Sequence, residues 1–200
     1  MADIAEIDHP LATVGAPAEG GCCYTCLDDT PAYPSDAVAK IASLANWESL
    51  GELTNNGYTE TKSISSTDQT GWHGSVILTT VESETNTYKA EFTEVMRPTV
   101  AKLRYGKNNV EVNDDGTIKH VVGKPVGLQT VPLVFDELLS NGTLCRTLVK
   151  KATITDFDDV PHKKGDLMVY GMTFTAAEVD GAAFEKWYAK PAATTTEAGA

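Results

Sequence analysis

Long apolar runs are missing from this sequence of 200 residues. No stretch approaches the ~20 consecutive apolar residues that a membrane-spanning helix needs. The N-terminal stretch MADIAEIDHPLATVG is acidic, and it has neither the positively charged region nor the apolar region of a secretory signal peptide. We therefore expect a soluble protein that is made in a cytoplasm and does not contact a membrane.

Sequence motifs of catalysis are missing as well. The chain has no G-x-S-x-G, no phosphate-binding loop, no G-x-G-x-x-G and no H-E-x-x-H. The acidic stretch with Asp156, Asp159 and Asp166 lacks the spacing and the closing glutamate of a calcium-binding loop. It is more typical of a solvated turn whose charge Lys163 and Lys164 offset. We therefore expect no enzyme activity, no bound metal and no cofactor.

Basic residues are few. The chain holds 16 Lys and Arg against 28 Asp and Glu, so its formal net charge is −12. Residues 1–60 contain ten acids and a single base, Lys40, and the remaining residues are close to balanced. Proteins that grip nucleic acid neutralise its phosphates with Lys and Arg. This composition argues against DNA binding, but it suits a protein that lies beside DNA without adhering to it.

Cysteine is also scarce. Three of the four cysteines, Cys22, Cys23 and Cys26, stand in the segment CCYTC, and the fourth is Cys145. A C-x-x-C pair can bind zinc or support redox chemistry. A zinc site normally needs a second pair at matching spacing, which this sequence does not contain. We therefore expect reduced thiols on a flexible arm.

Strand signals dominate what is present. Residues 50–53 predict a strand that ends in a hairpin turn at Asn56-Gly57, because both positions of such a turn need a positive φ. Residues 59–69, TETKSISSTDQ, have almost no apolar anchors. They predict either a long exposed hairpin or a loop that awaits a partner.

Two clearer strands follow, SVILTTVE and TYKAEFTEV, and residues 82–86 predict a turn between them. In the second strand Tyr88, Ala90 and Phe92 face one way, which is the period-2 pattern of a half-buried sheet. The segment RPTVAKLRYG then changes period and predicts one short helix that Gly106 ends. Later strands are separated by turns about every ten residues, with a second Asn-Gly hairpin at residues 140–142. This spacing predicts an antiparallel sandwich or barrel.

The chain divides into three parts by composition. Residues 1–45 predict an extended N-terminal arm without a core of its own, with a possible short helix at 36–45. Residues 46–180 predict the β domain. Residues 181–200 predict a C-terminal extension whose last ten residues are disordered.

In order and spacing, these segments resemble the major tail tube proteins of long-tailed (siphovirus-type) bacteriophages. The resemblance covers about residues 45–180. It rests on the first strand and turn, the long polar segment that ends at Trp72, the paired strands, the helix ending LRYG and the closing strand VYGMTFTA. The anchors of the fold on this reading are Trp47, Leu50, Gly51, Gly57, Gly106, Gly165 and Tyr170.

The resemblance implies a mainly β fold, an antiparallel β-sandwich of two crossed sheets flanked by one short α-helix, with an extended N-terminal arm. It implies that six subunits form a ring, and that rings stack into a hollow tube in the virion tail, assembled in the host bacterial cytoplasm. DNA passes through the lumen without specific binding. The other implied partners are the tape measure, tail tip and tail terminator proteins.

In this family the long polar segment reaches to the adjacent ring, which assigns that contact here to Thr59, Thr61, Ser63, Ser65, Thr67, Asp68 and Trp72. A segment without apolar anchors cannot offset its own ordering cost, so we expect residues 59–74 to be mobile in the monomer and ordered in the tube. Carboxylates that line the lumen of the tube would repel the phosphates of the passing DNA within a Debye length. The candidates for lumen-facing acids are Glu82, Glu84, Glu91 and Glu94.

Three other classes stay open at this point. A tube protein of a contractile tail or a related injection device would share the fold. A carbohydrate-binding or adhesion sandwich is disfavoured by the missing signal peptide and the free thiols, because secreted sandwiches favour disulfides. A β-rich hydrolase that uses Asp156, Asp159 or Asp166 lacks any recognisable nucleophile and base.

Overall fold

The computed structural model describes residues 12–18, 22–28 and 30–190. The predicted disorder of residues 191–200, and residues 1–11, 19–21 and 29 of the predicted N-terminal arm, therefore lie outside the described residues. The described elements, in chain order, are β1 (Gly15–Pro17), β2 (Cys23–Cys26), the 3-10 turn η1 (Ile41–Ser43), β3 (Trp47–Ser49), β4 (Leu53–Thr70), β5 (Val76–Phe92), α1 (Pro98–Tyr105), the 3-10 turn η2 (Lys107–Asn109), β6 (Val110–Val112), β7 (Ile118–Val121), β8 (Thr130–Leu139), β9 (Leu144–Phe157), β10 (Tyr170–Ala176) and β11 (Glu185–Ala189).

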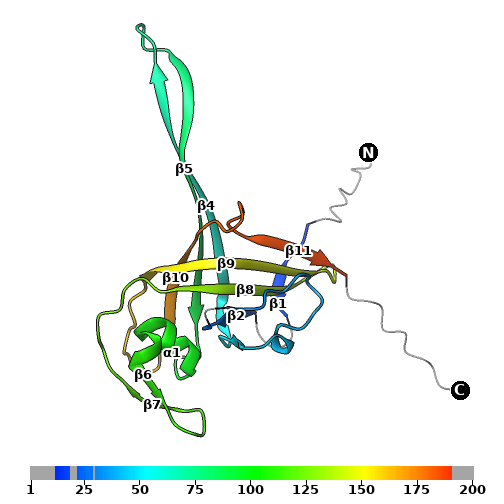
Figure 1. Ribbon diagram of the computed structural model, residues 1–200, viewed down its shortest axis with the longest axis vertical. Coiled ribbons are helices and arrows are strands. Elements are labelled where there is room, and N and C mark those ends of the chain that lie inside the picture. Colours follow the sequence, from blue (N-terminus) through cyan, green and yellow to red (C-terminus); the bar gives the residue numbers. More distant parts are fainter. Residues whose placement is uncertain (1–11, 19–21, 29, 191–200) are drawn as a thin grey trace, which may run out of the picture.

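Two crossed layers of antiparallel strands form the body of the protein. One layer contains β8, β9 and β11, and the other contains β10, β5 and β4, which run across the first (Figure 1). The layers belong to one hydrogen-bonded sheet of order β3-β2-β8-β9-β10-β5-β4. A register shift between Thr173 and Phe174 lies on the β9–β10 pair that joins them, and bulges of this kind bend and twist a strand. The predicted mainly β sandwich with one helix is confirmed, and β6 and β7 form a separate small sheet.

The core lies between the crossed layers. Tyr88, Ala90 and Phe92 are at most 1% exposed, so the predicted alternation in β5 is confirmed. The Phe135 ring of the other layer stacks on Tyr58 and Tyr88, with ring centroids 4.1 Å and 5.6 Å apart. Aromatic pairs at this separation stabilise the contact beyond their buried area. The two layers are therefore held face to face by side chains of β4, β5 and β8.

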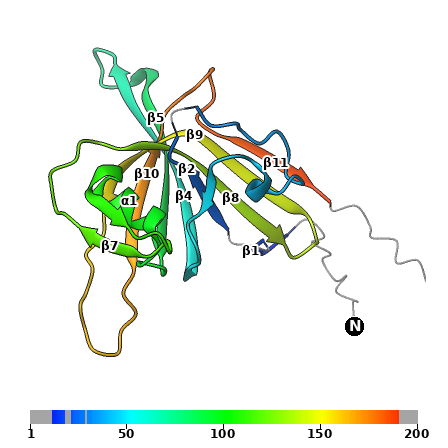
Figure 2. The ribbon, with the colours of Figure 1, turned by 60° about the horizontal axis from the view of Figure 1, so that its bottom comes forward.

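The predicted short helix is confirmed as α1, which covers one end of the sandwich (Figure 2). Pro98 occupies the first helical turn, where its missing N–H costs nothing. Gly106 follows the helix with a φ of +96°. A Cβ at this position would approach the Val126 side chain to 2.5 Å, so both the backbone angle and the space favour glycine.

The helix expected at residues 36–45 is replaced by the single 3-10 turn η1. Asp36 Oδ1 accepts hydrogen bonds from the backbone N–H groups of Val38 and Ala39, both at 2.7 Å. The carbonyl oxygens of Asp36 and Ala39 accept hydrogen bonds from the Arg146 guanidinium. The two N–H bonds to Asp36 are those of a helix N-cap, but the carbonyl oxygens of Asp36 and Ala39, which an α-helix would use next, are bonded to Arg146 instead.

The CCYTC segment is not on a flexible arm. It forms β2, which pairs with β8 on one side and β3 on the other. Cys23 and Cys26 are at most 1% exposed, and they lie in separate buried clusters on the two faces of the strand. Here the cysteines act as small apolar core residues, which is a common role of free cysteine. The boundaries between the predicted parts of the chain, after residues 45 and 180, stay predictions.

Two turns expected in the first half of the chain are also wrong. The Asn56-Gly57 pair makes no hairpin, because β4 continues through it. Residues 54–57 form a bulge between the pairs Leu53–Phe92 and Tyr58–Ala90, and the positive φ of Gly57 serves this bulge. Residues 82–86 are not a turn either, because β5 is continuous there. The Asn-Gly hairpin at residues 140–142 is confirmed between β8 and β9.

Candidate functional site

The longest hairpin of the structure leaves the sandwich. β10 pairs with β5 as far as Asn86, and beyond this point β4 and β5 pair with each other alone up to the turn at residues 71–75 (Figure 1). Ten residues separate Asn86 from Val76, which at ~3.3 Å per residue projects the tip roughly 30 Å. The candidate site is this projecting hairpin, residues 63–85.

The hairpin has two faces that its register defines. Residues directly opposite in an antiparallel pair share a face. Tyr58 lies opposite Ala90, and Glu60 lies opposite Tyr88; we call the continuation of this core-facing side the inner face. The other side is the outer face. Figure 1 shows the ribbon twisting, so both faces turn gradually about its long axis.

The outer face brings together five of the predicted contact residues. Thr59, Thr61, Ser63, Ser65 and Thr67 occupy alternate positions of β4, opposite residues that are themselves mostly Thr and Ser. The Thr67 hydroxyl donates a hydrogen bond to Glu82, which a register shift places beside it. This face is therefore a ladder of small hydroxyl side chains in which β-branched threonine suits the extended backbone.

The other two predicted contact residues lie elsewhere on the hairpin. Asp68 is on the inner face and accepts a hydrogen bond from Thr79 at 2.5 Å. Trp72 is in the turn and is 100% exposed. A fully exposed indole is unusual, because tryptophan normally gains much from burial.

The apolar side chains of the hairpin were missed by the sequence reasoning. Ile64, Val76 and Val81 lie on the inner face, and they are 56%, 55% and 67% exposed. Leu78 lies on the outer face and Ile77 beside Gly71 near the turn, and both are also exposed. The sequence signal was present in the strand SVILTTVE, but it reads like a core strand. Several large apolar side chains exposed on one element indicate an interaction site.

The base of the hairpin is fixed to the end of the chain. Lys186 of β11 pairs with Glu60 at 2.5 Å, and the Phe184 ring meets the Tyr88 ring edge-on with centroids 6.3 Å apart. Burial alone would lower the pKa of Lys186, but its hydrogen bond to Glu60 raises that pKa above the usual value. Just beyond, Lys62 and Glu84 pair across the strands at 2.7 Å. These contacts hold the direction in which the hairpin leaves the body.

The four candidate lumen acids do not form one cluster. Glu82 and Glu84 lie on opposite faces of the projecting hairpin. Glu91 remains in the sandwich and accepts a hydrogen bond from Thr54 at 2.9 Å. Glu94 follows β5, bonds the Arg97 guanidinium and accepts the backbone N–H of Glu52 at 3.1 Å. Their exposure to a lumen stays a prediction.

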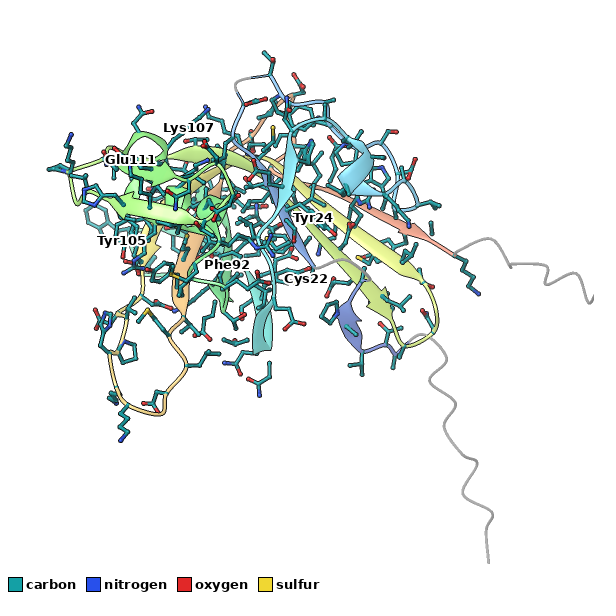
Figure 3. All side chains as sticks on the ribbon, turned by 90° about the horizontal axis from the view of Figure 1, so that it is seen from below. Cys22, Tyr24, Phe92, Tyr105, Lys107 and Glu111 are labelled. Atoms are coloured by element: carbon teal, nitrogen blue, oxygen red, sulfur yellow. The ribbon has the colours of Figure 1, made fainter. Side chains whose placement is uncertain are left out.

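The predicted fold anchors lie in the body, away from the projecting tip. Trp47 and Leu50 are buried, and the Trp47 indole donates a hydrogen bond to the carbonyl oxygen of Ala32 at 2.8 Å. Gly51 between β3 and β4 and Gly165 in a turn both adopt a positive φ. The ring of Tyr170 lies 4.8 Å from the Arg104 guanidinium, and burial raises the pKa of Tyr170 to about 12. Figure 3, seen from below, labels Cys22 and Phe92, which belong to one buried cluster of the body, and Tyr24, which belongs to the other.

Within the described part of the chain, no three His, Cys, Asp or Glu side chains gather as a metal site would require. Asp156, Asp159 and Asp166 are exposed around the β9–β10 loop. Burial raises the pKa of Cys22 to about 11 and that of Cys23 well above its usual value, so both thiols hold their protons. The described residues also contain no helix long and apolar enough to cross a membrane.

A crossed β-sandwich that extends a hairpin with exposed apolar side chains beyond its own core is typical of a subunit that assembles with other protein chains. The family model of the phage tail tube protein matches residues 17–199, and the chain belongs to that family. The resemblance found in the sequence is thereby confirmed. No curated protein matches the chain. It is a structural component of a phage tail, of a family that assembles into a tube with other tail proteins.

Proposed function

We propose that six copies of this chain form a ring, and that rings stack into a hollow tube through which phage DNA is delivered. The observation that carries the proposal is the projecting hairpin, residues 63–85. It exposes large apolar side chains along the roughly 30 Å by which it projects from the body. A hairpin of two strands has little stability alone, and a second molecule would supply the missing layer.

The same proposal identifies the partners of the chain and the acidic residues that line the lumen. The subunits contact each other, and the ends of the tube contact the tail tip and tail terminator proteins, with a tape measure protein inside during assembly in the host cytoplasm. DNA passes without specific binding, which suits a net charge of −12. Glu82, Glu84, Glu91 and Glu94 are the candidates for acidic groups that repel its phosphates. The chain acts by assembly and has no catalytic role.

Negative-stain electron microscopy of the purified chain at high concentration tests the proposal. We expect hollow filaments of uniform width. A matched variant replaces residues 64–84 with Asn-Gly, so that Ser63 and Thr85, which already pair, flank a two-residue turn. This variant should stay folded and form no filaments. Globular particles from the wild-type chain at every concentration, even with tail tip complexes added as nuclei, would contradict the proposal.

A further inference from the structure

A cleft of about 650 Å³ opens between β1 and the start of β4. One wall is formed by residues 15–18, and the other by the bulge of residues 54–57, where β4 leaves its ladder with β5. β1 pairs with β8 and not with β4 in the described structure, so the two walls stay apart. The volume lies within the range of roughly 300–1,000 Å³ that is typical of binding pockets.

The cleft is acidic. The half-buried carboxylate of Glu137 lines it and accepts a hydrogen bond from the Tyr58 hydroxyl at 3.0 Å, and the exposed Glu52 lines it as well. Within the described residues, no Lys or Arg lines the cleft or pairs with either carboxylate. Burial first, and then the charge of Glu137, raise the pKa of Tyr58. A half-buried carboxylate without a cation is poorly compensated, so this cleft favours a positively charged group.

The loop between β9 and β10 carries positive charge at its tip. Residues 161–167 are all exposed, and they contain Lys163 and Lys164 against the single acid Asp166, a formal charge of +1. The chain turns there, with the Asp166 N–H donating to the carbonyl oxygen of Lys163 at 3.4 Å and Gly165 at a φ of +95°. Neither lysine pairs with a carboxylate of the described chain. The tip is therefore a basic turn that extends away from the body (Figure 2).

The cleft and the loop lie on opposite sides of the molecule. Figure 2 shows β1 on one side of β4 and the loop between β9 and β10 on the other. A contact between two unlike surfaces of identical subunits is heterologous, and it closes into a ring when the rotation between copies allows it. Opposite charge on the two surfaces also fixes the register of such a contact.

We propose that Lys163 and Lys164 of one copy enter the cleft of the neighbouring copy in the same ring, beside Glu52 and Glu137. This rests on the proposed function, because ring formation brings the loop side of one copy against the cleft side of the next. It adds to that function a lateral contact that involves no residue of the projecting hairpin.

Charge reversals on the two surfaces test the contact. The cleft variant is Glu52→Lys, and the loop variant is Lys163→Glu with Lys164→Glu; all three side chains are exposed, so thermal unfolding of the monomer should match the wild type. By sedimentation velocity, each variant alone should need at least about fivefold more protein for half-assembly. In an equal mixture the two variants can alternate around a ring of six. Every contact then joins opposite charges, and half-assembly should return to within about threefold of the wild type.

The matched control reverses two lysines that belong to neither surface. Lys40 and Lys151 are exposed, and the double variant Lys40→Glu with Lys151→Glu changes the net charge as much as the loop variant does. Its half-assembly concentration should change less than about twofold. A photo-crosslinking residue at Lys164 should join residues 52–58 of another copy in the assembled state, and the same residue at Lys151 should not reach that segment.

Three results would overturn the inference and leave tube assembly intact. They are a loop variant that assembles like the wild type, a mixture that assembles no better than its components, and crosslinks from Lys164 that do not reach the cleft. A wild-type chain that stays monomeric up to about 1 mM, even with tail tip complexes added, would overturn the proposed function as well.

Discussion

At the scale of single residues, the Arg146 guanidinium ties residues 36–39 to the sandwich. It is 3% exposed, and it bonds both carboxylate oxygens of Asp136 at 2.6 Å and 2.7 Å. Its remaining nitrogen donates to the carbonyl oxygens of Asp36 and Ala39. A bidentate pair of this geometry is among the stronger polar contacts in proteins, and here it also fixes the segment before β3.

Removing one member of this pair should be costly because the other charge remains poorly solvated. We expect Arg146→Met to lower the free energy of unfolding by about 3–5 kcal/mol. The matched control is Lys62→Met on the exposed pair with Glu84, which should cost less than about 1 kcal/mol. Urea unfolding of both variants measures the difference. Similar costs for the two would show that burial of Arg146 adds nothing.

Buried thiols and phenols give the fold a dependence on alkaline pH. Burial raises the pKa of Cys22 from 9.0 to about 11, and it also raises the pKa of Tyr58 and Tyr88. These groups lose their protons first in the unfolded chain, so the folded state is favoured fully below pH 9 and progressively less between pH 9 and 11. We expect the urea midpoint to fall over this window, and to fall less in Cys22→Ala. A midpoint that stays level or rises would contradict this.

At the scale of elements, the β4–β5 hairpin should have two stabilities along its length. Residues 86–92 of β5 are held by β10 as well as β4, whereas residues 63–70 and 76–85 have only each other. We expect backbone amides of the projecting part to exchange with deuterium much faster than those of residues 86–92 in a verified monomer. In assembled tubes residues 59–74 should become protected. Strong protection in the monomer would contradict the predicted mobility.

The turns show what a sequence can and cannot predict. Asn141-Gly142 closes a hairpin as expected, but Asn56-Gly57 uses the same positive φ for a bulge. Turn chemistry specifies a backbone angle, and the register that decides between hairpin and bulge comes from distant partners, here Phe92 and Ala90. Residues 82–86 read as a turn because they are polar. They remain a strand because β4 pairs with them, from Ser83 opposite Ser65 to Asn86 opposite Lys62.

The sequence predicted which segment forms the candidate site, but not which of its apolar side chains are exposed. The polar alternation from Thr59 to Thr67 lies on one face, as strand periodicity requires. The apolar face could not be found this way, because Val76 and Val81 are the same residue types that fill a core. What exposes them is the absence of a covering layer in the described structure, a property of the whole fold. The expectation that CCYTC lies on a flexible arm was wrong for the opposite reason. The segment is buried because it pairs with β8, which is more than a hundred residues further along the chain.

At the scale of the whole molecule, the body and the projecting hairpin have separate structural roles. The crossed layers supply a rigid base, and the Glu60–Lys186 pair and the Phe184 ring set the direction of the projection. The outward side of the β10–β5–β4 layer carries mostly threonine with few charges, and Glu91 is one of those few. If this layer faces the lumen, as a tube of such subunits would allow, Glu91 stands where its carboxylate acts on passing phosphates.

Reversing the charge of Glu91 tests the role of the lumen lining separately from tube assembly. Glu91→Lys should leave the tubes unchanged in length and slow genome delivery, because a lysine ammonium attracts phosphate within a Debye length of about 8–10 Å. Glu111→Lys is the matched control, since Glu111 lies on the separate β6–β7 sheet and pairs there with Lys119. Tube length is measured by electron microscopy and delivery by DNA release from whole phage. Equal delivery by both variants would place Glu91 away from the DNA path, and the acidic lining would then have to come from the hairpin acids Glu82 and Glu84.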